Sequence, residues 1–273
     1  MLPTLTKLHH RIPKHTYTNI NHIVDPSPWP ILVAVTACQL LLSLLHYFET
    51  GKSWLFIFSL AQFSGFIWQW VYNISVEATY EGMHPKRVQR NILLGMCFFI
   101  LSEVMLFFSF FWAFFSFNLA PSIWISCTWP PAQIQLVNPY SLPLLNTVLL
   151  LSSGVSVTCA HRCLLVGKRH LFNLSLIWTI LYGVIFLCVQ YFEYNYTQFT
   201  ISDSVYGSIF YLLTGFHGLH VFVGLIFLTL CFYTSIKRNF TKEHHILFIC
   251  SAWYWHFVDI VWLFLYVFLY VLK

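Results

Sequence analysis

Long apolar stretches alternate with short polar connections along most of this chain. Seven of these stretches lack Asp, Glu, Lys and Arg, apart from a single acid in the third and another in the seventh. Each is long enough for the roughly 20 residues with which a helix crosses a bilayer. Transmembrane β-strands would instead give shorter segments of alternating polarity, so the pattern predicts seven transmembrane helices and an all-α fold. The predicted helices cover 29–48, 54–76, 91–118, 141–160, 171–192, 204–236 and 246–272.

The predicted helices organise the chain into three parts. A polar N-terminal segment covers 1–28, a first helix pair covers 29–80, and five further helices follow over 81–273. Ser202 or Asp203 is expected to cap the start of the sixth helix. The cysteines are scattered and form no CxxC pattern, so they are interpreted as small apolar residues and not as a disulfide framework or zinc site.

Composition supports a membrane location. Charged residues make up 8% of the chain and hydrophobic residues 58%, whereas a soluble domain has about 25% charged residues. So few charges cannot cover a water-facing surface, and most of the outer surface must face lipid. The net charge of +5 is explained by topology, described next, and we expect no nucleic-acid partner.

The basic residues fall mainly on one side of the predicted membrane. With seven helices, twelve of the 14 lysines and arginines lie in the N-terminal segment and in the loops on that same side. The other side holds only Lys52 and Lys273. The positive-inside rule therefore places the N-terminus inside, in the cytoplasm or mitochondrial matrix, and the C-terminus outside.

Glu103 is an isolated acid within the third apolar stretch. No other charged residue occurs between Arg90 and Arg162. An ionisable group at this depth is costly, so it faces protein or water and usually has a function. Two hypotheses follow, a proton relay or a hydrogen bond that fixes helix packing. We favour the second because no other acid lies within a turn of Glu103.

Two other sites combine histidine with helical spacing. Asp259 follows His256 by three residues, so both lie on one face of the seventh helix. The pair could bind a metal, shuttle a proton or simply hydrogen-bond to each other, and we favour the last. His217 and His220 share a face of the sixth helix and could ligate haem iron or a metal pair. Nearby glycines favour close helix packing there instead.

Polar residues also gather at the inner ends of several predicted helices. Groups of this kind bind anionic lipid headgroups or serve only to set the topology, and the sequence favours neither hypothesis. Motifs of a self-sufficient active site are missing: the chain shows no phosphate loop, catalytic triad or paired catalytic acids. The inner-end residues are Glu77, His84, Lys237, Arg238, His244 and His245.

Five strings of sequence carry a family resemblance. They are VDPSPWP, SEVMLFFSFFWAF, NPYSLPLLNTVLLLSSGVSVT, FTISDSVYGSIFYLLTGFHGLHVFVG and HHILFICSAWYWHFVDIVWLFLYV. Together they resemble subunit III of the haem–copper cytochrome c oxidases, from about Val24 to the C-terminus. That family also has seven helices with an inner N-terminus, which the charge pattern indicates independently.

The resemblance implies an architecture and a role. Helices one and two would be separated from helices three to seven by a V-shaped cleft filled with phospholipid, anionic or zwitterionic. The chain would carry no haem, copper or other metal, because the haems and copper reside in partner subunits. It would pack directly on catalytic subunit I, join subunit II and accessory subunits, and support proton uptake during oxygen reduction.

The resemblance also assigns individual residues. Glu103 matches the family's buried carboxylate of helix three, and Glu77, His84 and Lys237 match positions near the cleft lipid. Where the family has an arginine three residues before Lys237 this chain has Thr234, and Arg238 could take its place.

Two other functions are consistent with the sequence, and the location has two alternatives. A polytopic proton or solute transporter would use Glu103 and Asp259 in its pathway, and a quinol oxidase has an equivalent subunit.

A mitochondrial inner membrane, with the N-terminus in the matrix and the C-terminus in the intermembrane space, fits the abundance of Phe, Tyr and Leu and the lack of a recognisable targeting signal. A bacterial plasma membrane is the alternative.

Overall fold

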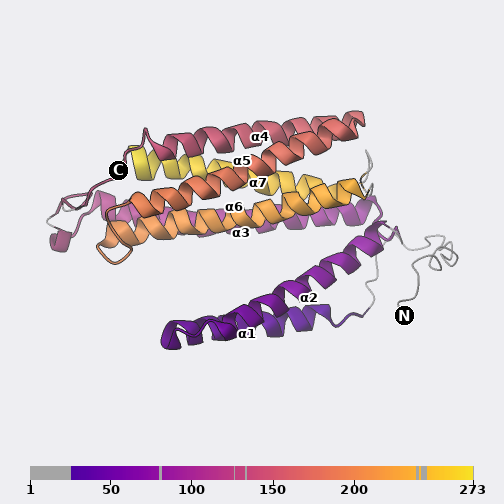
Figure 1. Cartoon of the computed structure of the whole chain (residues 1–273), viewed down its shortest axis with the longest axis horizontal. Coiled ribbons are helices and arrows are strands. Elements are labelled where there is room, and N and C mark those ends of the chain that lie inside the picture. The colour runs from indigo at the N-terminus through magenta and orange to yellow at the C-terminus, as the bar shows by residue number, and fades with distance from the viewer. Residues whose placement is uncertain are drawn as a thin grey trace. The chain divides into compact units, whose positions relative to one another are not determined.

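The computed structural model describes residues 26–79, 82–125, 127–132, 134–237, 240 and 245–272. Regular structure in these ranges is entirely helical, and seven helices are long and apolar enough to cross a membrane (Figure 1). The predicted all-α, seven-helix membrane protein is therefore confirmed. The helices are α1 (Trp29–Thr50), α2 (Trp54–Thr79), α3 (Lys86–Leu119), α4 (Leu142–Val166), α5 (Arg169–Tyr196), α6 (Val205–Ile236) and α7 (Ile246–Leu265), with a short helix η2 (Ile123–Ile125) and a π-helix η3 (Tyr266–Val271).

Glycines terminate two of these helices. Gly51 follows α1 with φ 70°, and its N–H donates to the carbonyl of Tyr47 at 2.8 Å. Gly167 follows α4 with φ 88°, and its N–H lies 3.0 Å from the carbonyl oxygens of Cys163 and Leu164. A residue without Cβ adopts this left-handed backbone without strain, so both helices end where the sequence supplies glycine.

Ser204, not Ser202 or Asp203, caps α6. The Ser204 hydroxyl accepts a hydrogen bond from the N–H of Gly207 at 3.2 Å. Asp203 instead closes the preceding turn, where its carboxylate accepts from the N–H of Thr200 at 2.5 Å. The sequence prediction of the cap was therefore wrong, because a turn-closing bond competes for the Asp203 side chain.

The described chain divides into two compact units. One holds α1, α2 and the start of α3, and the other begins at Leu93 and holds the rest of α3 together with α4 to α7. In the first unit, α1 and α2 pack along each other as a hairpin. The hydroxyls of Ser43 and Ser59 form a hydrogen bond of 2.5 Å between them.

In the second unit, α7 is the most buried helix. It packs against α4 and α6, while α5 packs against α4 and α6 (Figure 1). Trp255 and Trp262 of α7 are fully buried, and each indole N–H donates to α4, to the hydroxyl of Ser153 at 2.8 Å and to that of Thr147 at 3.0 Å. These bonds fix α7 along α4.

Aromatic side chains attach α3 to the same unit. Phe107 lies edge-on to Phe257 of α7 with ring centroids 6.1 Å apart, and Phe110 contacts Phe216 of α6 at 5.1 Å. Rings of this size hold helices together through broad apolar contact. They also bring the middle of α3 opposite the middle of α6, which positions the first candidate site.

Candidate functional site

Glu103 of α3 and His220 of α6 form a direct pair inside the second unit. The Oε2 atom of Glu103 lies 2.7 Å from Nε2 of His220, and both side chains are largely buried. The other ring nitrogen, Nδ1, lies 2.6 Å from the carbonyl oxygen of Phe216, one turn earlier in α6. Phe107 closes the site from α3, with its ring 5.0 Å from the imidazole.

The hydrogen bonds of His220 determine how many protons the pair holds. A carbonyl oxygen only accepts, so Nδ1 carries a proton that it donates to Phe216. The short contact on the other side then contains one further proton, on Glu103 or on Nε2. The pair is uncharged overall in both cases, either as two neutral groups or as an ion pair. Moving the proton between the two atoms changes the charge of each group without changing their sum.

His217, one turn before His220, faces a different helix. Its Nε2–H donates to the carbonyl oxygen of Val258 of α7 at 3.2 Å, and within the described part of the chain its buried Nδ1 has no partner. The imidazole is packed between Phe186 and Trp262. His217 and His220 therefore connect α6 to α7 and α3 respectively and do not converge on one point.

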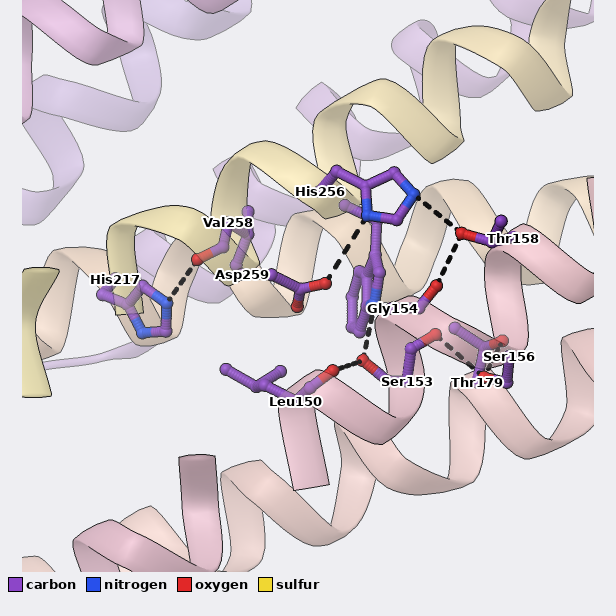
Figure 2. Close-up of polar contacts among 11 residues, drawn as sticks. Leu150, Ser153, Gly154, Ser156, Thr158, Thr179, His217, His256, Val258 and Asp259 are labelled. Atoms are coloured by element: carbon purple, nitrogen blue, oxygen red, sulfur yellow. Dashed lines mark hydrogen bonds and ion pairs between the residues drawn. The ribbon is translucent and has the colours of Figure 1, made fainter. Parts of the chain in front are cut away.

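Asp259 of α7 lies against α4 at Gly154, with His256 beside it (Figure 2). A Cβ atom on Gly154 would lie 2.7 Å from Oδ2 of Asp259, so only glycine leaves room for the carboxyl group. That oxygen is 3.8 Å from Nδ1 of His256, which is within ion-pair distance, as the dashed line in Figure 2 marks, but beyond hydrogen-bond distance. The Oδ1 atom of Asp259 is buried and has no hydrogen-bond partner among the described residues.

The remaining ring nitrogen of His256 also contacts α4. Nε2 lies 3.4 Å from the hydroxyl oxygen of Thr158, whose own proton is donated to the carbonyl of Gly154 at 2.9 Å. The hydroxyl therefore accepts, and Nε2 of His256 is the donor. Asp259 and His256 lie on one face of α7, as their spacing predicts, but their side chains do not form a hydrogen bond with each other.

A third buried acid, Glu193 of α5, was missed by sequence reasoning. It is 1% exposed, and its Oε1 atom accepts from the hydroxyl of Tyr270 at 2.6 Å and from Nε2 of Gln190 at 3.5 Å. Asn146 of α4 extends this network by donating to Gln190 at 3.2 Å. The predicted fifth helix ended at 192 and excluded Glu193. The spacing of three residues from Gln190, which puts both on one helical face, was a usable signal.

The residues expected to bind lipid are placed as follows. Lys237 follows the last turn of α6 as an exposed cation, with its ammonium 5.6 Å from the ring centroid of Tyr233. Glu77 lies near the end of α2, and the carbonyl of His84 accepts from the side chain of Gln89 at 2.9 Å. Arg238 and His244 lie outside the described residues.

Within the described ranges, no group of three or more His, Cys, Asp or Glu side chains is arranged to hold a metal ion. Among the described residues, the three acids differ in their partners: Glu103 bonds to another helix, Glu193 belongs to a hydrogen-bonded network through Oε1 and leaves Oε2 buried without a partner, and the Asp259 carboxyl group makes no hydrogen bond and has a buried, unpaired Oδ1. The Glu103–His220 pair forms a short hydrogen bond between α3 and α6, and the other polar contacts mainly connect helices.

Comparison with known proteins gives consistent results. A sequence model of the family described as "Cytochrome c oxidase subunit III" matches residues 18–273. The chain is 47% identical over 251 residues to "Cytochrome c oxidase subunit 3" of Prototheca wickerhamii, covering 91% of this chain and 96% of that protein. Proteins of the same name from Anopheles gambiae and Litocranius walleri are 47% and 46% identical, covering 91% and 93% of this chain and 95% and 97% of their own lengths.

Proposed function

The chain belongs to the cytochrome c oxidase subunit III family, and we propose from this that it serves as a non-catalytic core subunit of a respiratory terminal oxidase. In this role it packs on catalytic subunit I and stabilises it within a complex that also contains subunit II and accessory subunits. The haems and copper that reduce oxygen belong to the partner subunits. The seven apolar helices make it a multi-pass membrane protein.

Family membership carries this proposal, and the Glu103–His220 bond supports the structural part of it. That bond joins α3, which aromatic rings otherwise hold, to α6 in the centre of the second unit. A bond of this kind between transmembrane helices contributes about 0.6–2 kcal/mol. The same pair holds one transferable proton, so it also supports sustained proton uptake by the complex.

We propose a lipid-binding role for the polar groups at the helix ends. The ammonium of Lys237 is exposed and contacts only the ring of Tyr233 among the interactions described. A basic side chain at the end of a transmembrane helix attracts anionic headgroups by about 1 kcal/mol. The mitochondrial inner membrane is the proposed location, because the chain is rich in Phe, Tyr and Leu. The N-terminus is placed on the inner side, in the matrix, because twelve of the 14 basic residues fall on that predicted side.

Purification through an affinity tag on this chain tests the proposal. We expect the chain to bring with it a complex that has the visible absorption of haem and oxidises cytochrome c. The separated chain is expected to have no visible absorption and, in liposomes, no proton or solute flux. Haem absorption from the separated chain, or flux that Glu103→Gln abolishes, would contradict the proposal. Oxidation of quinol instead of cytochrome c would move the chain to the related quinol oxidases.

A further inference from the structure

An open groove of about 620 Å³ lies between α4 and α7, within the second unit. Both helices are long and apolar enough to span a membrane, so the groove faces whatever surrounds the chain in the bilayer. Its walls are mostly apolar, and four polar side chains interrupt them: Thr158, His256 and Asp259, and Arg162 one turn beyond Thr158 toward the end of α4. The residues that matter here are Leu151, Val155, Thr158, His256, Asp259 and Leu263.

Asp259 gives the groove a carboxyl group without a hydrogen-bond partner in the described residues, near mid-membrane depth. It lies close to the midpoint of the apolar span Ile246–Val271. One carboxyl oxygen has no hydrogen-bond partner in the ranges that the structure describes, and the other is 3.8 Å from Nδ1 of His256. Asp259 itself lines the groove, so its carboxyl group borders the open space. In hydrocarbon, a polar group left without a partner is costly, and acids at this depth normally pair with one.

His256 adds a second polar group on the same surface. Its side chain is 41% exposed, and its ring lies between Asp259 and Thr158 at the edge of the groove (Figure 2). An imidazole and a carboxyl group on one face of a transmembrane helix are poorly solvated by acyl chains. The polar groups of this surface are therefore satisfied only when a polar group from outside the described residues covers them.

We propose that this groove is a docking surface for a transmembrane helix of a neighbouring oxidase subunit, which places an N–H or O–H donor against Asp259. The inference rests on the proposed function, because it requires partner subunits. A lipid acyl chain fits the apolar walls but carries no donor, and lipid headgroups lie at the membrane surface. A helix supplies both the apolar side chains for Leu151 and Leu263 and a donor at mid-membrane depth.

Photo-crosslinking within the intact complex identifies the occupant. A benzophenone amino acid replaces Val155 in the groove and, in a control, Val184, which is exposed on α5 outside the groove. We expect position 155 to crosslink to a peptide of another oxidase subunit. Crosslinks from position 155 only to phospholipid, or to a second copy of this chain, would overturn the proposal.

Two substitutions measure the contribution of the groove to assembly. Val155→Trp fills the groove without removing a polar group, and Val184→Trp makes the same change elsewhere. We expect Val155→Trp and Asp259→Leu to accelerate loss of the chain from the detergent-washed complex about three- to tenfold, and Val184→Trp to leave it unchanged. Equal loss rates for both tryptophan variants, or no change with Asp259→Leu, would contradict docking at this surface.

These results separate the docking proposal from the proposed function. A wild-type chain that does not purify with a haem-containing complex contradicts the function. A chain that does so, but with only lipid crosslinked at position 155, retains the function and loses the docking surface. Protease resistance of each variant chain shows whether it is folded, and Asp259→Asn, which keeps an acceptor oxygen, is expected to restore much of the retention lost in Asp259→Leu.

Discussion

Two regions of the second unit each pair a carboxyl group with a histidine, and they differ in where the histidine comes from. Glu103 of α3 bonds at 2.7 Å to His220, which belongs to α6. Asp259 lies 3.8 Å from His256, which belongs to its own helix, and its Oδ1 atom has no hydrogen-bond partner among the residues that the structure describes. The fold of the chain supplies a hydrogen-bond partner for the carboxyl group of Glu103 but none for that of Asp259 within the described residues.

The difference shows how a subunit of a membrane complex divides its polar groups. A hydrogen bond between helices within the chain stabilises the bundle itself. A polar group that the chain leaves unsatisfied, next to an open groove, is available to a partner. The same residue types therefore stabilise the fold in one region and, by our proposal, the assembly in the other.

The largest expected effect comes from removing Trp255, the buried side chain that holds α7 against α4 near Asp259. Trp255 is fully buried, packs on Gly183 and Gly224, and bonds to Ser153 of α4. We expect Trp255→Ala to lower the free energy of unfolding by about 3–5 kcal/mol through cavity formation and a lost hydrogen bond. The loss is measured by heating the complex and monitoring the unfolding of this chain through its protease resistance. A decrease below about 1 kcal/mol would mean that α7 is not fixed to α4 in this way.

A smaller effect is expected from crowding Asp259 directly. Gly154→Ala places a Cβ atom 2.7 Å from Oδ2 of Asp259, so the carboxyl group must move. We expect a loss of about 1–2 kcal/mol in the same unfolding assay. Gly218→Ala on α6 is the matched control, because no atom lies within 4 Å of the added Cβ. Equal effects of the two changes would show that Asp259 is not held against Gly154.

The Glu103 region should respond to the loss of one hydrogen bond. We expect Glu103→Ala to destabilise the chain by about 1–2 kcal/mol and to reduce sustained proton uptake while the haem spectrum stays intact. In a double-mutant cycle, Glu103→Ala with His220→Ala should cost little more than either change alone. Strictly additive losses would show that the two residues do not stabilise each other.

The smallest effect is expected at Asp259 within the separated chain. Asp259 has no hydrogen-bond partner inside the described chain, so Asp259→Asn removes no internal bond. We expect its unfolding free energy to stay within about 0.5 kcal/mol of the wild type. Steric trapping in micelles measures this, with Glu103→Gln as the contrasting variant. A loss as large as that of Glu103→Gln would remove the distinction between the two regions.

The helices were predictable from sequence because crossing a bilayer imposes an apolar length that few other structures require. Their ends were less predictable, since capping depends on local competition such as that between Ser204 and Asp203. The fifth helix extends past its predicted end to Tyr196, and this extension buries Glu193.

The partners of the site residues were beyond sequence reasoning. Helical spacing places His217 and His220 on one face, but packing decides that one reaches α7 and the other α3. Likewise, spacing puts His256 and Asp259 together, while the 3.8 Å gap depends on the contact of Asp259 with Gly154. Periodicity identifies a face, and only the tertiary arrangement identifies the neighbour.

A density map of the intact, tag-purified complex tests the contrast between the two regions most directly. We expect Glu103 to remain bonded to His220 with no group from another subunit between them. We also expect a helix of another subunit in the α4–α7 groove, with a donor within about 3.2 Å of the Asp259 carboxyl group. Acyl-chain density filling the groove beside an unpaired Asp259 would contradict this account.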